Sequence, residues 1–234
     1  MIYEKNLDDL IKYVFIHIEK NEDFIDEKAF LDNIYLMLEI LKLSNYVKKV
    51  SIVNSKLYVG CYYEKELIFN FEMMKKLYYY KLIDKQKYVL EILRIILHEI
   101  IHVNHSKIIN ENIDLITKKI IELSYYLKFI TDDKVEFHNL FPDERDANIN
   151  SGYIIYRCFG ISDYLIKYVV DGFSHEEYPF AKLERYLFNN SFKFKEMMAC
   201  LCDTEKLIYG FDNVFYNEKL DNQKIIELIG QRKI

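Results

Sequence analysis

One helical segment decides how this chain folds, and it reads Tyr88-Val89-Leu90-Glu91-Ile92-Leu93-Arg94-Ile95-Ile96-Leu97-His98-Glu99-Ile100-Ile101-His102. Its first part is apolar almost all round, which predicts a helix buried inside a domain. His98 and His102 are four residues apart, so both imidazoles lie on one helix face with Cβ atoms about 5–6 Å apart. From there both can reach one ion at Zn–N distances of about 2.0–2.1 Å. Glu99 points to the side of that face, where it can take a proton from metal-bound water without coordinating the metal.

The alternative is a core helix whose histidines fall at this spacing by chance. Three fixed positions in a chain of this length arise by chance in roughly one protein in a hundred. Against that alternative, each unpaired buried polar group costs about 1–3 kcal/mol, and a metal ion would give both imidazoles a partner. We therefore interpret His98 and His102 as metal ligands and Glu99 as a catalytic base.

A third ligand is needed, because a catalytic zinc site takes three protein ligands and leaves a fourth position for water. The candidates further along the chain are His105, His138, Asp143, Glu144 and Asp146. His105 would turn away from the other two histidines on a straight helix, which makes it a neighbour of the site. His138 stands in a loop-like stretch and stays open as a ligand.

Glu144 has the most favourable local sequence. Pro142 and Asp143 predict a helix start, because proline suits the first turn and carboxylates there complement the helix dipole. Glu144 would then project from the first turn of a new helix. On these residues alone, the alternative that Asp143 and Glu144 merely cap a surface helix stays open.

Together, His98-Glu-x-x-His102 and Pro142-x-Glu144-Arg145-x-Ala147 resemble the motifs of gluzincin-type zinc metallopeptidases carried by phages and mobile elements of Gram-positive bacteria. These include relatives of the repressor-cleaving ImmA/IrrE peptidases. The resemblance covers roughly residues 46–157. It implies that His98, His102 and Glu144 bind Zn²⁺, that Glu99 is the catalytic base, and that the substrate is a protein or peptide. The chain departs from the family pattern at Ile101 and Asn148, and in an extra helix expected at 113–130.

The expected fold class is α+β: a mostly helical, zincin-like domain with a small antiparallel sheet before the histidine helix. Alternating apolar residues predict three strands, at Val47–Val53, Lys56–Tyr63 and Glu66–Phe71. Asn54-Ser55 and Glu64-Lys65 are plausible tight turns between them. We interpret the third strand as an exposed edge that an extended peptide could join by β-augmentation. A central place for that strand stays equally open.

The rest of the chain is expected to be helical, as a single domain over residues 1–234. Its parts are N-terminal helices (1–45), the sheet and metal-site core (46–157) and a C-terminal helical extension (158–234). Apolar spacing predicts further helices at Leu7–Glu19, Ile25–Leu43, Asp143–Phe159, Ser162–Val170, Tyr178–Phe188, Phe194–Gly210 and Lys224–Ile229. Tyr153 and Tyr156 follow the third ligand and could stabilise an oxyanion, although most of the 21 tyrosines must serve packing.

Composition limits the function classes. The net charge of −5 argues against a general nucleic-acid binder, whose phosphate contacts need a basic face. No run reaches the eighteen or so apolar residues of a membrane span, and the N-terminus lacks the pattern of a signal peptide. Four cysteines form no disulfide framework, which predicts a reducing cytoplasm. Cys200-Leu-Cys202 is more typical of buried helix residues than of half a metal site.

The two motifs thus predict a cytoplasmic zinc-dependent metallopeptidase, and the family resemblance implies a regulatory protein as its substrate. One alternative is a zinc-binding regulatory or interaction protein on the same scaffold without turnover. Another is a helical interaction protein with no metal. Neither a nucleic acid nor a membrane is expected as a partner.

Overall fold

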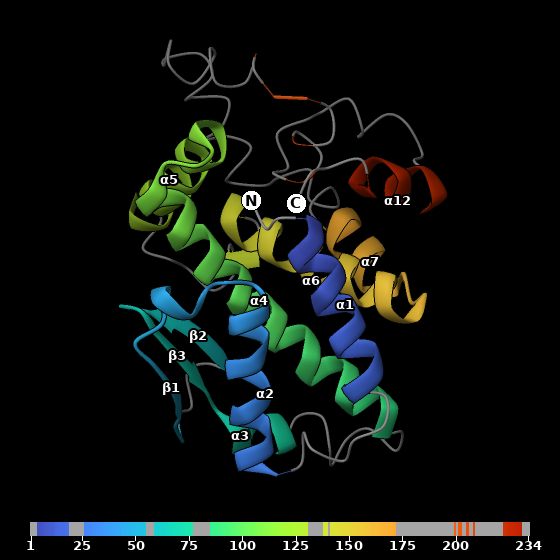
Figure 1. The fold of residues 1–234 in the computed structure, drawn as a ribbon. Helices are drawn as coiled ribbons and strands as arrows, with labels where there is room; N and C mark the ends of the chain where they lie inside the picture. Colours follow the sequence, from blue (N-terminus) through green and yellow to red (C-terminus); the bar gives the residue numbers. More distant parts are fainter. Residues whose placement is uncertain are drawn as a thin grey trace. The chain divides into compact units, whose positions relative to one another are not determined.

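The computed structural model describes residues 4–18, 26–54, 59–76, 85–130, 138–139, 141–171, 199, 201–202, 205, 208 and 222–230. Within these residues the chain is mostly helical and has one small mixed sheet, which agrees with the α+β class (Figure 1). The predicted helix at 178–188 lies outside the described residues, as does most of the one at 194–210. No helix in the described part of the chain is long and apolar enough to cross a membrane.

The chain divides into two compact units. The first comprises the described residues up to Glu111 together with Ile154–Ile161, and the second comprises Asn112–Tyr153 and the described residues from Ser162 onward. Elements of the first unit are α1 (Glu4–Ile18), α2 (Glu27–Ile40), η1 (Ser44–Tyr46), β1 (Lys49–Ile52), β2 (Gly60–Tyr63), β3 (Glu66–Phe69), α3 (Phe71–Met74) and α4 (Lys85–Glu111). Those of the second are α5 (Leu115–Ile130), α7 (Asp163–Asp171) and α12 (Asn222–Gly230), while α6 (Pro142–Phe159) contributes to both.

The sheet has the strand order β1-β3-β2. β2 and β3 pair antiparallel, but β1 and β3 pair parallel, with Lys49 opposite Glu66. The expectation of an all-antiparallel sheet was therefore wrong, and so was the interpretation of Glu66–Phe71 as an edge. Leu67 and Phe69 on β3 are fully buried, whereas no residue of β2 is. β3, which carries these two fully buried side chains, takes the central place, where both rows of its backbone groups are paired, and β2 lies at an end of the described sheet.

The turn at Glu64-Lys65 is confirmed. Both residues have positive φ, 49° and 66°, and they join β2 to β3 as a two-residue hairpin loop. Positive φ at both loop positions matches the twist of the flanking strands. The tight turn predicted at Asn54-Ser55 would have made β1 and β2 neighbours, which they are not; Ser55 itself lies outside the described residues.

Aromatic side chains pack α2 against the sheet in the first unit. The ring of Phe30 on α2 lies 5.3 Å from that of Phe69 in an edge-to-face arrangement, and 5.1 Å from that of Phe71. All three rings are buried. Edge-to-face aromatic pairs contribute about 0.5–1.5 kcal/mol beyond the area they bury. This cluster fixes the sheet whose strand β2 contacts α4.

Helix α4 confirms the predicted buried helix and is longer than the apolar run alone suggested. It is continuous over Lys85–Glu111, because apolar residues that include Val103 and Ile108 continue the buried stripe beyond His102. The chain leaves the helix at Asn112, whose φ of 51° is typical of a left-handed C-terminal cap. His98 and His102 therefore lie in the helix interior, where the backbone is held on both sides.

In the second unit, two helix starts follow from local chemistry. Asp114 precedes α5, and its carboxylate accepts hydrogen bonds from the backbone amides of Ile116 and Thr117 and from the Thr117 hydroxyl. Proline 142 opens α6, as predicted, because its missing N–H would have no partner in a first turn. Further along α6, a Cβ on Gly152 would meet the backbone of Leu165 on α7 at 2.9 Å, so glycine lets these helices pack closely.

Candidate functional site

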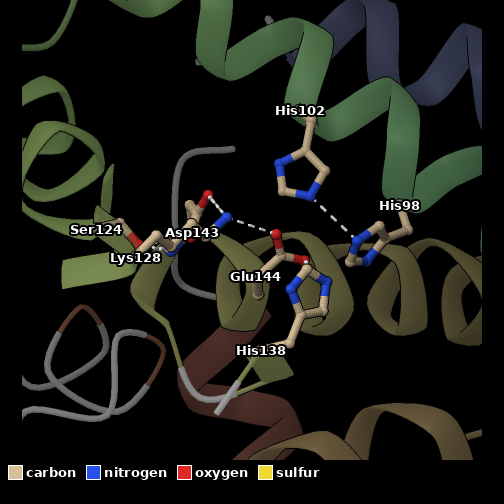
Figure 2. A network of polar contacts seen from close by, with 7 residues as sticks. All are labelled: His98, His102, Ser124, Lys128, His138, Asp143 and Glu144. Carbon is tan, nitrogen blue, oxygen red and sulfur yellow. Dashed lines mark hydrogen bonds and ion pairs between the residues drawn. The ribbon is translucent and has the colours of Figure 1, made fainter. Parts of the chain in front are cut away.

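The histidine pair on α4 has the geometry of two ligands to one ion. The Nε2 atoms of His98 and His102 lie 3.1 Å apart, and the rings meet edge to face (Figure 2). A tetrahedral ion with two Zn–N distances of 2.0–2.1 Å sets its two nitrogens about 3.3 Å apart. Both imidazoles are half-buried. Each ring thus directs the same nitrogen toward a common point, at nearly the separation that a shared ion requires.

Glu99, the predicted base, is buried beside the sheet. Its side chain approaches β2 so closely that a Cβ on Gly60 would lie 3.0 Å from its Cγ and Oε1 atoms. The same Cβ would lie 3.1 Å from Cγ2 of Ile95 on the same helix. Sequence reasoning did not single out Gly60, although a glycine inside a strand often marks a close approach of this kind. Strand β2 therefore limits where the Glu99 carboxylate can lie.

The carboxylate candidate, Glu144, projects from the first turn of α6, as expected. Its Oε1 accepts a hydrogen bond from the Lys128 ammonium at 2.7 Å, and its Oε2 lies 3.3 Å from Nε2 of His138 (Figure 2). Lys128 also donates to Oδ2 of Asp143 at 2.7 Å. The Glu144 and Asp143 side chains are only 5% and 1% exposed. Asp143 and Glu144 are buried and paired, so the alternative that they merely cap a surface helix is wrong.

Lys128 is the counter-charge of this pair of acids. Burial alone would lower the pKa of its ammonium group, but the attraction of Glu144 and Asp143, with their hydrogen bonds, outweighs burial and raises that pKa. The ammonium also lies 5.7 Å from the Phe141 ring centre and 5.9 Å from that of Tyr125. Lys128 is therefore a fixed positive charge beside Glu144.

His98, His102 and Glu144 form a group that could hold a metal ion: one ligand atom from each lies within 4.8 Å of the others. Two neutral imidazoles and one carboxylate are a donor set that Zn²⁺ accepts in catalytic sites. His105, His138, Asp143 and Asp146 are not part of this group. These are the three residues that the resemblance implied as ligands.

The remaining candidates have other surroundings. His105 is buried on α4, with its ring 5.3 Å from that of His102, which fits a neighbour of the pair. His138 is half exposed and pairs with Glu144, while Asp143 pairs with Lys128. Tyr153 is buried, and its hydroxyl faces Gly230 of α12, whereas Tyr156 is only half-buried.

The expectation that Cys200-Leu-Cys202 consists of buried helix residues was wrong for Cys202, which is exposed and non-helical. Cys200 lies outside the described residues.

Two functional candidates on α5 escaped sequence reasoning. Lys128 and Ser124 lie one helical turn apart, and both contact Asp143. In the sequence they are an ordinary lysine and serine in an amphipathic helix. No spacing rule links them to Glu144, because the contact joins two helices.

No known protein family, curated protein or solved structure matches this chain.

Proposed function

We propose that this protein is a zinc-dependent metallopeptidase that hydrolyses peptide bonds, with His98, His102 and Glu144 as the metal ligands and Glu99 as general base. The observation that carries the proposal is the histidine pair, whose Nε2 atoms are 3.1 Å apart on a buried helix. The donor set and the adjacent carboxylate follow the chemistry of HExxH peptidases. Zn²⁺ is the metal that best suits two imidazoles, one carboxylate and an open position.

The chemistry is divided between the metal and the chain. When bound, a zinc ion supplies Lewis acidity that lowers the pKa of a coordinated water to about 7. Glu99 does not belong to the ligand group, and we assign proton transfer to its carboxylate. It accepts the proton of the attacking water and delivers it to the nitrogen of the leaving amine. The close approach of Gly60 limits the positions that the carboxylate can adopt.

An extended peptide is the substrate form that the sheet favours. β2 lies at an end of the described sheet, and its Gly60 contacts Glu99. A peptide that paired with β2 by β-augmentation would pass beside the proposed base. This proposal replaces Glu66–Phe71 with β2 as the docking strand. As the physiological target we propose a regulatory protein of the bacterial cell, on the strength of the motif resemblance.

The decisive experiment compares Glu99→Gln with Glu91→Gln. Glu91 lies on the same helix and forms an ion pair with Arg94 at 3.2 Å, so it is a matched control without a role in the proposal. Each purified protein is incubated with a diverse peptide library, and new termini are identified by mass spectrometry. We expect Glu99→Gln to retain bound zinc and to lose cleavage by about 10²–10⁴-fold, while Glu91→Gln cleaves like the unaltered protein.

Three other results would change the assignment. Undiminished cleavage by Glu99→Gln would reject Glu99 as the base. Stoichiometric zinc in the unaltered protein without any cleavage would favour the non-catalytic regulatory protein on the same scaffold. An unaltered protein that binds no metal would reject both and leave the helical interaction protein.

A further inference from the structure

We propose that Lys128 is a built-in cation that competes with the metal for Glu144 and thereby lowers the affinity of the site. This inference rests on the proposed metal site, and it adds a residue that controls how tightly that site binds. Its basis is the contact network of Ser124, Lys128, Asp143 and Glu144, all within the second unit (Figure 2).

The first step is the geometry around the ammonium. Lys128 Nζ lies 2.7 Å from Oδ2 of Asp143 and 2.7 Å from Oε1 of Glu144. Both acids are almost completely buried, whereas the lysine side chain is 18% exposed. Two buried carboxylates in adjacent positions repel each other unless a cation lies between them. The ammonium group fills this role from within the chain.

The second step is that Lys128 can keep its place when Glu144 binds a metal. Asp143 is held independently: the Ser124 hydroxyl donates to its Oδ1, and its backbone N–H donates to Ser124 Oγ at 3.2 Å. The rings of Tyr125 and Phe141 flank the ammonium. If Glu144 turns toward a metal, Lys128 retains Asp143 as its partner, so its positive charge stays close to a second cation.

Two opposing influences of Lys128 decide whether its loss raises or lowers the metal affinity of the site. A residue that orients a ligand usually raises metal affinity, and losing it costs about 10–100-fold. A unit charge a few ångströms from the metal changes affinity by a larger factor, on the order of 100–1,000-fold at the effective dielectric of a protein site. Loss of Lys128 also removes the cation that Asp143 and Glu144 share, which leaves more negative charge to attract a divalent ion. Repulsion outweighs orientation, and a net effect of about tenfold is expected.

The experiment measures zinc affinity by titration against a competing chelator for the unaltered protein, Lys128→Met, Lys128→Arg and Lys118→Met. Methionine keeps the apolar stem and removes the charge, and arginine keeps the charge. Lys118 is the matched control, because it is on the same helix but pairs with Asn112 and Glu122. We expect Lys128→Met to bind zinc about tenfold more tightly, and the other two variants to stay within about twofold of the unaltered protein.

The possible results separate the two proposals. If the unaltered protein binds zinc and Lys128→Met binds with equal or lower affinity, the role of Lys128 is rejected and the metal site stands. If the unaltered protein binds no zinc, both are rejected.

If Lys128→Met does not fold without metal, it is refolded with zinc or with magnesium and followed by circular dichroism. Selective recovery with zinc supports the proposal, and no recovery overturns it.

Discussion

The two halves of the candidate site stabilise their buried polar groups in different ways. The histidine region, which comprises His98, Glu99 and His102 on α4 with Gly60 on β2, presents two imidazoles from the interior of a long helix. The carboxylate region, which comprises Ser124 and Lys128 on α5, Asp143 and Glu144 on α6, and His138, presents an acid that is already paired. Burial of an ionised carboxylate is costly without a counter-charge, whereas two imidazole rings can share a hydrogen bond. Helix geometry is thus sufficient to arrange the two histidines of the first region, while the second region requires contacts between helices.

The sharpest test of this comparison removes one histidine from each region. We expect His98→Ala to lower zinc affinity on the order of a thousandfold, because the metal loses one of three protein ligands. His138→Ala should retain zinc, because His138 contacts Glu144 but does not belong to the ligand group. Metal content after gel filtration, measured by mass spectrometry, distinguishes the two. Loss of zinc in His138→Ala would indicate that His138 is a ligand, and would contradict the assignment of both imidazole ligands to the histidine region.

A second test concerns how firmly β2 fixes Glu99 in the histidine region. In Gly60→Ala, the new methyl group would lie 3.0 Å from Cγ and Oε1 of Glu99, so the carboxylate must shift. We expect kcat for peptide cleavage to fall about tenfold while bound zinc is unchanged, because the general base loses its alignment. Cys61→Ala is the control, since alternate side chains of β2 point to opposite faces of the sheet. Full activity of Gly60→Ala would show that Glu99 is not confined by β2.

The smallest expected effect concerns the start of α5, the helix that carries Lys128. Partial burial raises the pKa of Asp114, but hydrogen bonds from the Thr117 side chain and from the backbone of Thr117 and Ile116 outweigh it and hold that pKa below its usual value. Asp114→Ala should reduce the free energy of unfolding by about 1 kcal/mol at neutral pH. Since the folded pKa is the lower one, this stabilisation is present above the unfolded pKa of about 3.9 and is lost as pH falls through the folded pKa.

Urea unfolding of Asp114→Ala at neutral and acidic pH measures this difference. Asp26→Ala at the start of α2 is the matched cap in the first unit, where a single amide, that of Ala29, donates to the carboxylate. The effect of Asp26→Ala should be smaller at neutral pH. If the free energy of unfolding of Asp114→Ala stays below that of the unaltered protein by the same amount below about pH 3, a role for the ionised carboxylate is contradicted.

Local sequence signals were sufficient for most helices and failed for the pairing of the strands. The apolar stripe that leads to His98 and the proline that opens α6 each have a physical meaning within a few residues. Strand order has no such local source. Residues 47–53 and 56–63 look like partners of a hairpin, yet β3 lies between β1 and β2 because Leu67 and Phe69 gain more burial in the centre. That competition among strands depends on helices far away in the sequence.

The sequence by itself determined the histidine pair, because 3.6 residues per turn bring positions four apart onto one face of any helix. It also determined the first-turn position of Glu144, through Pro142. Only the tertiary structure decided that Lys128 faces two buried acids and that Gly60 meets Glu99, since both contacts join elements that no local spacing rule connects. Periodicity along one helix follows from backbone geometry alone, whereas the partner of a buried charge is chosen when separate elements pack.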